Sequence, residues 1–273
     1  MPELLPVPKF HPHFCPHGFA HPAAKTLPKR LLRALVFHPN FREYGLNGLY
    51  VLETGASEMN LAKPLPTYLV QRYQGWKATT YQENQAWYRH LADHGQHPRA
   101  MVISCCDSRV HVTSIFGADQ GEFFIHRNIA NLVPPHKPDG LQHGTSAAVE
   151  YAVTALKVAH VIVIGHSKCG GVNGCHDMCT GHAPQLEEKS SFVGRWMDIL
   201  RPGFERVKEL PEAERRSALE RQAVIVSLEN LMTFPFVKEA VESGTLTLHG
   251  LWTDTGEGSL EWFDPSTGGF RKV

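Results

Sequence analysis

The sequence has no excess of charge of either sign. Its 27 Lys and Arg residues balance its 27 Asp and Glu residues, for a formal net charge of zero. Proteins that bind nucleic acid usually show a basic surplus that faces the phosphates, so this balance argues against a nucleic-acid partner. The sequence also lacks an apolar run as long as a membrane span. We therefore expect neither nucleic acid nor a membrane as a partner.

Cysteine is scarce, with six residues in a chain of 273. Short secreted proteins built on disulfides are much richer in cysteine. Cys105 and Cys106 are adjacent, which is poor geometry for a mutual bridge. The sequence also lacks the apolar core of a secretory signal. We interpret the cysteines as metal ligands or buried thiols in a reducing, cytoplasmic setting.

Residues 1–58 differ from the rest of the chain. The first 28 residues are rich in proline and histidine and have no helical or strand period, which is typical of disorder. Lys25–Arg42 is basic with a few spaced leucines, so targeting to an organelle stays open, as does an upstream start codon or an added extension before Met59. We predict an N-terminal extension over residues 1–58 and one functional domain over residues 59–273.

Strands and helices alternate along that domain. The predicted strands lie at the apolar end of residues 98–103 and at residues 122–126, 160–165, 245–252 and 260–264. The predicted helices are two within residues 66–94 and others at residues 110–116, 145–157, 187–220 and 227–243. Residues 171–186 are expected to be a loop, and Ala223–Val226 is short and β-branched like a strand. The pattern predicts an α/β fold with a mostly parallel sheet, closed by an antiparallel hairpin that turns at Gly256–Gly258.

Two predicted strands end in residues that suit a metal. Cys105 follows the first strand, and His166 and Cys169 follow the strand at residues 160–165. The carboxyl ends of parallel strands meet at one edge of a sheet, where ligands and catalysts gather. Thiolates and an imidazole are ligands that zinc prefers, and three of them leave one tetrahedral position open. The sequence therefore predicts a catalytic zinc site.

An aspartate and an arginine follow the first of these cysteines. Asp107 has two open roles, because it can complete the metal's coordination or accept a hydrogen bond from a metal-bound water. Arg109 bears on the choice, since a guanidinium forks onto a carboxylate and would hold it away from the metal.

A second group of metal-binding side chains stands in the expected loop. Cys175, His176, Cys179 and His182 have a spacing that would permit another zinc site. No strand or hairpin is predicted to frame them, so the spacing alone leaves a second site open.

The sequence resembles the β-class carbonic anhydrases from about Leu65 to Phe263. The motifs that carry the resemblance are Cys-x-Asp-Ser-Arg at 105–109, His-x-x-Cys-Gly-Gly at 166–171, Gln-x-Pro at 96–98, Arg-Asn-Ile-Ala-Asn-Leu-Val-Pro-Pro at 127–135, Ala-x-Glu-Tyr-Ala-Val at 148–153, Glu-Asn-Leu at 229–231 and Leu-His-Gly at 248–250. The resemblance implies reversible hydration of carbon dioxide to bicarbonate and a proton by a zinc-bound hydroxide.

The resemblance also assigns residues to roles. It implies one Zn²⁺ per chain on Cys105, His166 and Cys169, with Asp107 and Arg109 as the catalytic dyad. The implied substrate pocket is lined by Gln96, Phe124, Ile129, Tyr151 and Gly170. The implied assembly is a homodimer, or a dimer of dimers, in which the leading helices embrace the partner and part of each pocket crosses the interface.

The sequence departs from one subclass of this family, in which the aspartate binds zinc and bicarbonate inhibits. Val102 and Thr253 stand where that subclass has a tryptophan and a tyrosine, so we hypothesise an open zinc site with Asp107 on Arg109 at neutral pH. Two rivals stay open. The same fold and metal could hydrolyse carbon disulfide or carbonyl sulfide, or the chain could be a non-catalytic zinc-binding protein.

Overall fold

The computed structural model describes residues 62–138, 143–188 and 191–273. The chain divides into two units, residues 1–66 and residues 67–273. Of the first unit only residues 62–66 are described, and they are exposed and without regular structure. The predictions made for residues 1–58 therefore lie outside the described residues.

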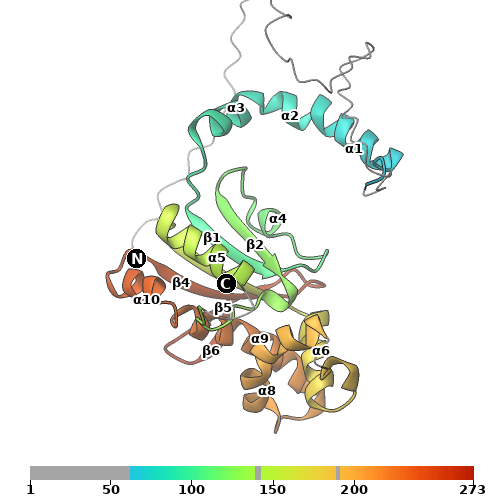
Figure 1. Ribbon diagram of the computed structural model, residues 1–273, viewed down its shortest axis with the longest axis vertical. Helices are drawn as coiled ribbons and strands as arrows, with labels where there is room; N and C mark the ends of the chain where they lie inside the picture. Colours follow the sequence, from blue (N-terminus) through green and yellow to red (C-terminus); the bar gives the residue numbers. More distant parts are fainter. Residues whose placement is uncertain (1–61, 139–142, 189–190) are drawn as a thin grey trace, which may run out of the picture. The chain divides into compact units, whose positions relative to one another are not determined.

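A six-stranded mixed sheet with the order β2-β1-β3-β4-β5-β6 organises the second unit (Figure 1). Its strands are β1 Ala100–Cys105, β2 Phe123–Asn128, β3 His160–His166, β4 Thr247–Thr253, β5 Leu260–Asp264 and β6 Gly269–Lys272. The first four are parallel, and β5 and β6 add an antiparallel edge. The predicted fold class is confirmed, and β6 is a strand that the sequence analysis missed.

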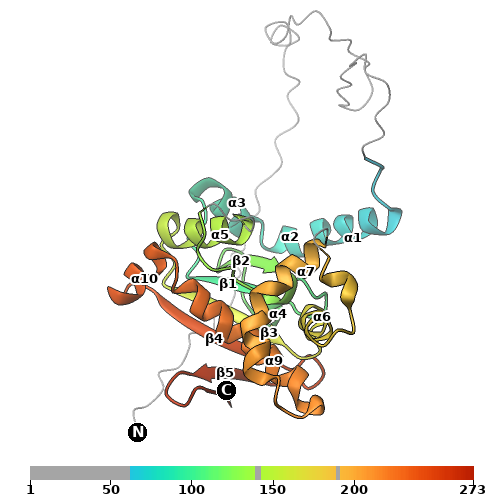
Figure 2. The ribbon, with the colours of Figure 1, turned by 60° about the horizontal axis from the view of Figure 1, so that its bottom comes forward.

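Helices cover the sheet and extend beyond it. The α-helices are α1 Thr67–Ala78, α2 Thr80–Glu83, α3 Gln85–His94, α4 Val112–Phe116, α5 His143–Glu150, α6 Gly170–Cys179, α7 Phe192–Met197, α8 Arg201–Val207, α9 Glu212–Leu231 and α10 Pro235–Glu242. A π-helical turn, Tyr151–Ala155, extends α5. Figure 1 shows α6, α8 and α9 gathered at one end of the sheet, and Figure 2 shows α9 running alongside it. Among the described residues, no helix is long and apolar enough to cross a membrane.

The core lies on both faces of the central strands. Every residue of β1 is buried, as expected for a strand between two parallel neighbours. Met101 and Ile103 pack with α9 and α10 side chains on one face, whereas Val102 packs with Val112 of α4 on the other. Cys105 continues the first face into a separate apolar cluster built from α6 to α9. The end of β1 is thus held rigidly before it turns into the site.

Two local predictions are wrong. The expected loop at residues 171–186 begins instead with helix α6, although three glycines lower its helical propensity. A Cβ added to Gly171 would lie 2.6 Å from Ile129 Cγ2, so close packing explains the glycine there. Ala223–Val226 lies inside α9, where Leu219, Ala223 and Val226 are buried at helical spacing. The burial of these side chains, rather than the β propensity of branched residues, determines that Ala223–Val226 is helical.

Helix α1 is exposed along its whole length. Every one of its residues is exposed, including Tyr68, Leu69, Tyr73 and Trp76. The rings of Trp76 in α1, Tyr81 in α2 and Tyr88 in α3 form an aromatic cluster that connects the three helices.

Candidate metal centre

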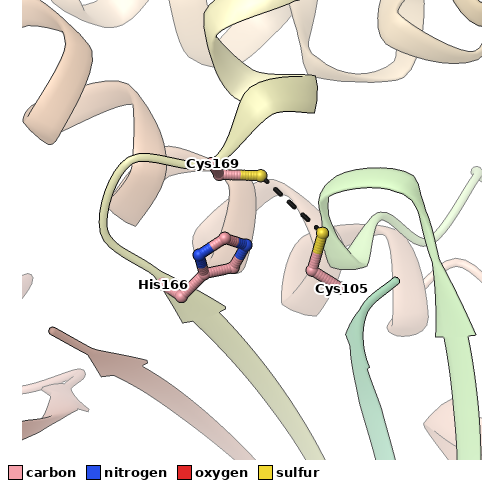
Figure 3. A group of neighbouring side chains, drawn as sticks. All are labelled: Cys105, His166 and Cys169. Atoms are coloured by element: carbon pink, nitrogen blue, oxygen red, sulfur yellow. Dashed lines mark hydrogen bonds between the residues drawn. The ribbon is translucent and has the colours of Figure 1, made fainter. Parts of the chain in front are cut away.

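The structure brings the three predicted ligands together. Cys105 and His166 are the last residues of neighbouring parallel strands β1 and β3, and Cys169 is the residue before α6. Their ligand atoms, two sulfurs and an imidazole nitrogen, lie within 4.8 Å of one another. Figure 3 shows the three side chains converging on one point, with the sulfurs of Cys105 and Cys169 3.8 Å apart. All three residues are buried.

The donor atoms fit a tetrahedral metal. His166 Nδ1 donates to the carbonyl oxygen of Ser167 at 2.9 Å, which leaves Nε2 with a lone pair. That Nε2 is buried and has no hydrogen-bond partner within the described residues. Two sulfurs on a tetrahedral zinc with bonds of about 2.3 Å would lie about 3.8 Å apart, which matches the separation found here. These residues are therefore able to hold Zn²⁺ with little rearrangement.

The electrostatics of the two thiols favour a metal ligand. A hydrogen bond from Cys169 lowers the pKa of Cys105 to about 4, against the opposing effect of burial. The same hydrogen bond, together with burial, raises the pKa of Cys169. One proton shared between two sulfurs explains the opposite directions. A thiolate is thus available at neutral pH. A cation that takes the place of the shared proton would offset the free-energy cost of burying the negatively charged sulfur.

Asp107 is held by Arg109 in the predicted arrangement. Arg109 Nη2 lies 2.6 Å from Asp107 Oδ2, and Nε lies 2.9 Å from Oδ1. The backbone N–H of Arg109 also donates to Oδ1 at 3.0 Å. These bonds hold the pKa of Asp107 well below its usual range. The carboxylate is therefore ionised and its direction is fixed.

Two arginines connect the strand ends around the ligands. Arg109 Nη2 donates to the carbonyl oxygen of Lys168 at 3.0 Å, which ties the β1 end to the β3 end. Arg127 donates to the carbonyl oxygens of Cys105 at 2.9 Å and Asp107 at 2.8 Å. The sequence analysis gave Arg127 only a place in a family motif. Arg127 lies on β2, the strand beside β1. Its contacts with the β1 end depend on how the two strands are paired, which the sequence alone does not give.

A buried glutamate that the sequence analysis missed also reaches the site. Glu220 of α9 accepts the backbone N–H of Cys169 through Oε1 at 3.4 Å and Trp252 Nε1–H through Oε2 at 3.3 Å. Burial raises the pKa of Glu220, and hydrogen bonds from the backbone N–H groups of Lys168 and Cys169 oppose the rise. The residue stands in a charged helical stretch, where sequence alone predicts a solvent-exposed side chain.

The residues expected to line a pocket fall into two groups. Gly170 directly follows Cys169, and Ile129 lies beside Gly171, so both are next to the ligand-bearing segments. Phe124 pairs in register with Met101, four residues before Cys105, or about 13 Å along the strand. Its ring lies 5.8 Å from that of Tyr151, which is 49% exposed.

Gln96 belongs with Phe124 and Tyr151, in the group that lies away from the ligands. It is exposed and lies before β1, at the end of the strand opposite to Cys105. The fold of one chain therefore brings Ile129 and Gly170 to the ligands, but does not bring Gln96, Phe124 and Tyr151 there.

The second group of metal-binding side chains does not converge. His176 Nδ1 faces Asp177 Oδ1 at 3.2 Å, and Cys175 Sγ faces the carbonyl oxygen of Met197 at 3.7 Å. His182 lies beyond the end of α6 and pairs with Thr180 Oγ1 at 2.8 Å. Within the described ranges, the group of Cys105, His166 and Cys169 is the single candidate for a metal. The second site that the spacing permitted is not formed.

Comparison with known proteins agrees with this geometry. The family model described as "Pro_CA: Carbonic anhydrase" matches residues 100–260. "Beta carbonic anhydrase 3" of Arabidopsis thaliana is 37% identical over 194 residues, which cover 69% of this chain and 73% of the relative. "Beta carbonic anhydrase 5, chloroplastic" of the same plant is 34% identical over 184 residues, which cover 66% of this chain and 58% of the relative.

Solved structures are similar over the same part of the chain. The beta-carbonic anhydrase CcaA superposes with a TM-score of 0.68 at 28% identity and covers 76% of this chain and 91% of its own. A structure of two beta-carbonic anhydrases from the ascomycete Sordaria macrospora, described as tetrameric, gives a TM-score of 0.62 at 30% identity. It covers 75% of this chain and 97% of the solved one.

Proposed function

The chain belongs to the β-class carbonic anhydrases, and we propose that it hydrates carbon dioxide reversibly to bicarbonate and a proton at a zinc centre. The observation that carries the proposal is the convergence of Cys105, His166 and Cys169 at the ends of two adjacent strands, with Nε2 of the histidine buried and unpartnered. One Zn²⁺ per chain would be held by these three residues. When bound, zinc supplies Lewis acidity, which makes water a good nucleophile at neutral pH.

Asp107 and Arg109 would orient that water. The carboxylate stays ionised because Arg109 holds it with two side-chain hydrogen bonds, so its remaining lone pairs can accept a hydrogen bond from a water. The same bonds turn the carboxylate toward the arginine, which supports an open fourth position on the metal at neutral pH. Asp107 would thus fix the direction of the attacking oxygen, and Arg109 would fix Asp107.

The substrate pocket would be completed by a second copy of the chain. Gln96, Phe124 and Tyr151 lie away from the ligands of their own chain. Tyr151 is half-exposed, and its ring lies beside Phe124 of the edge strand β2. The exposed aromatic and aliphatic residues of α1 offer a surface for the partner. We propose a homodimer, or a dimer of dimers like the tetrameric relatives, in which these three residues face the metal of the partner.

Two further assignments remain proposals. We assign residues 59–273 to the carbonic anhydrase domain and residues 1–58 to an extension. The cytoplasmic setting rests on cysteine usage alone, and one relative carries the description chloroplastic. The location of the full chain in cells, compared with that of a chain that lacks residues 1–58, tests whether the extension directs targeting.

Stopped-flow hydration of carbon dioxide at pH 7.5 tests the proposal, on full-length protein whose zinc content has been measured. We expect fast turnover by the parent and a loss of about 100-fold in Asp107→Ala at unchanged zinc content. Turnover that appears only near pH 8.5 would mean that Asp107 caps the metal and the site is closed at neutral pH. Turnover of carbonyl sulfide or carbon disulfide but not carbon dioxide would favour the hydrolase rival, and a zinc-loaded but silent protein would favour a binding role.

A further inference from the structure

The loop that carries Cys169 has an uncommon backbone conformation. Ser167 and Lys168 connect the end of β3 to Cys169, and Lys168 has φ 54, in the left-handed region that residues other than glycine rarely adopt. Such a conformation persists only where the surroundings determine it. The direction of the Cys169 side chain follows from this turn, so whatever holds the turn also places one ligand of the proposed zinc centre.

Contacts from three elements hold the turn. Arg109 Nη2 binds the carbonyl oxygen of Lys168 at 3.0 Å from one side. The backbone N–H of Ser167 donates to the carbonyl oxygen of Thr253 in β4 at 2.9 Å. Glu220 of α9 accepts the backbone N–H of Cys169 at 3.4 Å from the buried side. Of these three partners, only Glu220 contacts the backbone of Cys169, the proposed metal ligand; the other two contact Lys168 and Ser167.

The burial of Glu220 needs an explanation. The residue is only 5% exposed, and a buried carboxylate is unfavourable unless its oxygens are satisfied. Its neighbour Arg221 is engaged elsewhere, with Glu261 at 2.8 Å. The two oxygens of Glu220 instead face two N–H donors, the Cys169 backbone and Trp252 Nε1. An apolar residue would fill this position in an ordinary helix core, whereas this carboxylate is placed to serve those donors.

We propose that Glu220 is a positioning residue of the metal centre, which holds the Cys169 backbone so that Sγ points at Cys105 and His166. This inference rests on the proposed zinc centre and adds a residue that touches neither substrate nor metal. Groups behind metal ligands typically change metal affinity by 10- to 100-fold when they are removed.

Metal binding by the full-length chain tests the proposal. Zinc affinity is measured by competition with a chromogenic chelator, and cobalt is bound in place of zinc so that its visible absorption reports the geometry of the ligands. The variants are Glu220→Ala and Glu220→Gln. A matched control is Asp264→Asn, which alters a carboxylate that is also 5% exposed but lies at the end of β5, where it binds Ser266. Trp252→Phe removes the other N–H donor, and it also makes smaller the buried ring over which Arg221 Cζ lies at 3.8 Å.

We expect Glu220→Ala to lose at least tenfold in zinc affinity and to shift the cobalt absorption bands. Glu220→Gln should lose less, because glutamine keeps one acceptor oxygen but places an amide N–H₂ against the second donor. Trp252→Phe and Asp264→Asn should keep the parent's affinity and spectrum. A Glu220→Ala protein with parental affinity and spectrum would overturn the inference, as would an equal loss in Asp264→Asn.

Two further results are decisive. If Glu220→Ala does not fold, Glu220→Gln decides alone, and the proposal requires a loss of at least threefold together with a changed cobalt spectrum. A parent protein that takes up neither zinc nor cobalt would instead reject the proposed metal centre. The failure of the inference and the failure of the proposed function are thereby distinguished.

Discussion

Two groups of cysteines and histidines in this chain have similar composition and opposite outcomes. The first, Cys105, His166 and Cys169, is spread along the chain, yet its ligand atoms lie within 4.8 Å of one another. The second, Cys175, His176, Cys179 and His182, lies close together in the sequence, but its four ligand atoms do not gather at one point. Cys175 pairs with Cys179, whereas His176 bonds to Asp177 and His182 bonds to Thr180. Strand register gathers distant residues at one edge, whereas a helix brings together only residues spaced by three or four positions, such as the two cysteines.

Each of the two groups also has an aspartate–arginine ion pair beside it. Asp107 pairs with Arg109 beside the first group at 2.6 Å, and Asp177 pairs with Arg216 beside the second at 2.7 Å. Asp177 Oδ1 also pairs with His176 Nδ1, so that carboxylate satisfies one nitrogen of a buried imidazole, whose Nε2 has no hydrogen-bond partner among the described residues. Asp107 faces a set of converging ligands instead. The same ion pair therefore serves packing in one place and, as we propose, catalysis in the other.

The largest predicted effect separates the two groups by metal content. Cys105→Ser should abolish zinc binding and carbon dioxide hydration, because three ligands are needed and serine does not supply a thiolate. Cys179→Ser, a matched change in the second group, should leave both at the parent's level. Elemental analysis of the purified full-length proteins measures the metal. Zinc retained in Cys105→Ser, or lost in Cys179→Ser, would contradict the assignment of the site to the strand ends.

The next effect compares the two aspartates. Asp107→Asn should keep zinc but lose roughly 100-fold in kcat, because a neutral amide accepts the hydrogen bond from the water more weakly than an ionised carboxylate. Asp177→Asn removes the equivalent charge from the second group and should leave kcat unchanged. Stopped-flow kinetics with zinc analysis measures both. A rate loss in Asp107→Asn that is matched by zinc loss would assign the residue to metal binding instead of orientation.

Removal of the metal should change the reactivity of one group only. Coordination blocks the sulfurs of Cys105 and Cys169, so treatment with a chelator should increase their alkylation by iodoacetamide several-fold. Cys179 is partly exposed and lies 3.8 Å from Arg201 Nη1, outside the metal site, so its alkylation should not change. Peptide mass spectrometry quantifies each cysteine in the same sample. Equal changes at Cys179 and Cys105 would indicate general unfolding rather than local exposure.

The convergence of Cys105, His166 and Cys169 was more predictable from the sequence than the contacts around them. The ligands follow two apolar strands, and the parallel arrangement that brings strand ends together was itself predictable from alternating strands and helices. Glu220 was not predictable, because its burial depends on how α9 crosses the sheet and on Trp252 in β4. Helix α6 was missed for a related reason. One of its glycines, Gly171, is explained by Ile129, which is distant in the sequence and adjacent in space.

The smallest effect concerns the second group as packing. Cys175 is completely buried in the apolar cluster that also contains Cys105 and Cys169. Cys175→Ala should leave a small cavity that costs about 1 kcal/mol, or a fall in Tm of about 2–4 °C for a domain of this size. Zinc content and kcat should stay at the parent's level, because the side chain bonds to the backbone of α7 and to Cys179, neither of which holds the proposed zinc. Calorimetry on the zinc-loaded protein measures the change, and a coupled loss of zinc would show that the second group supports the first through the shared cluster.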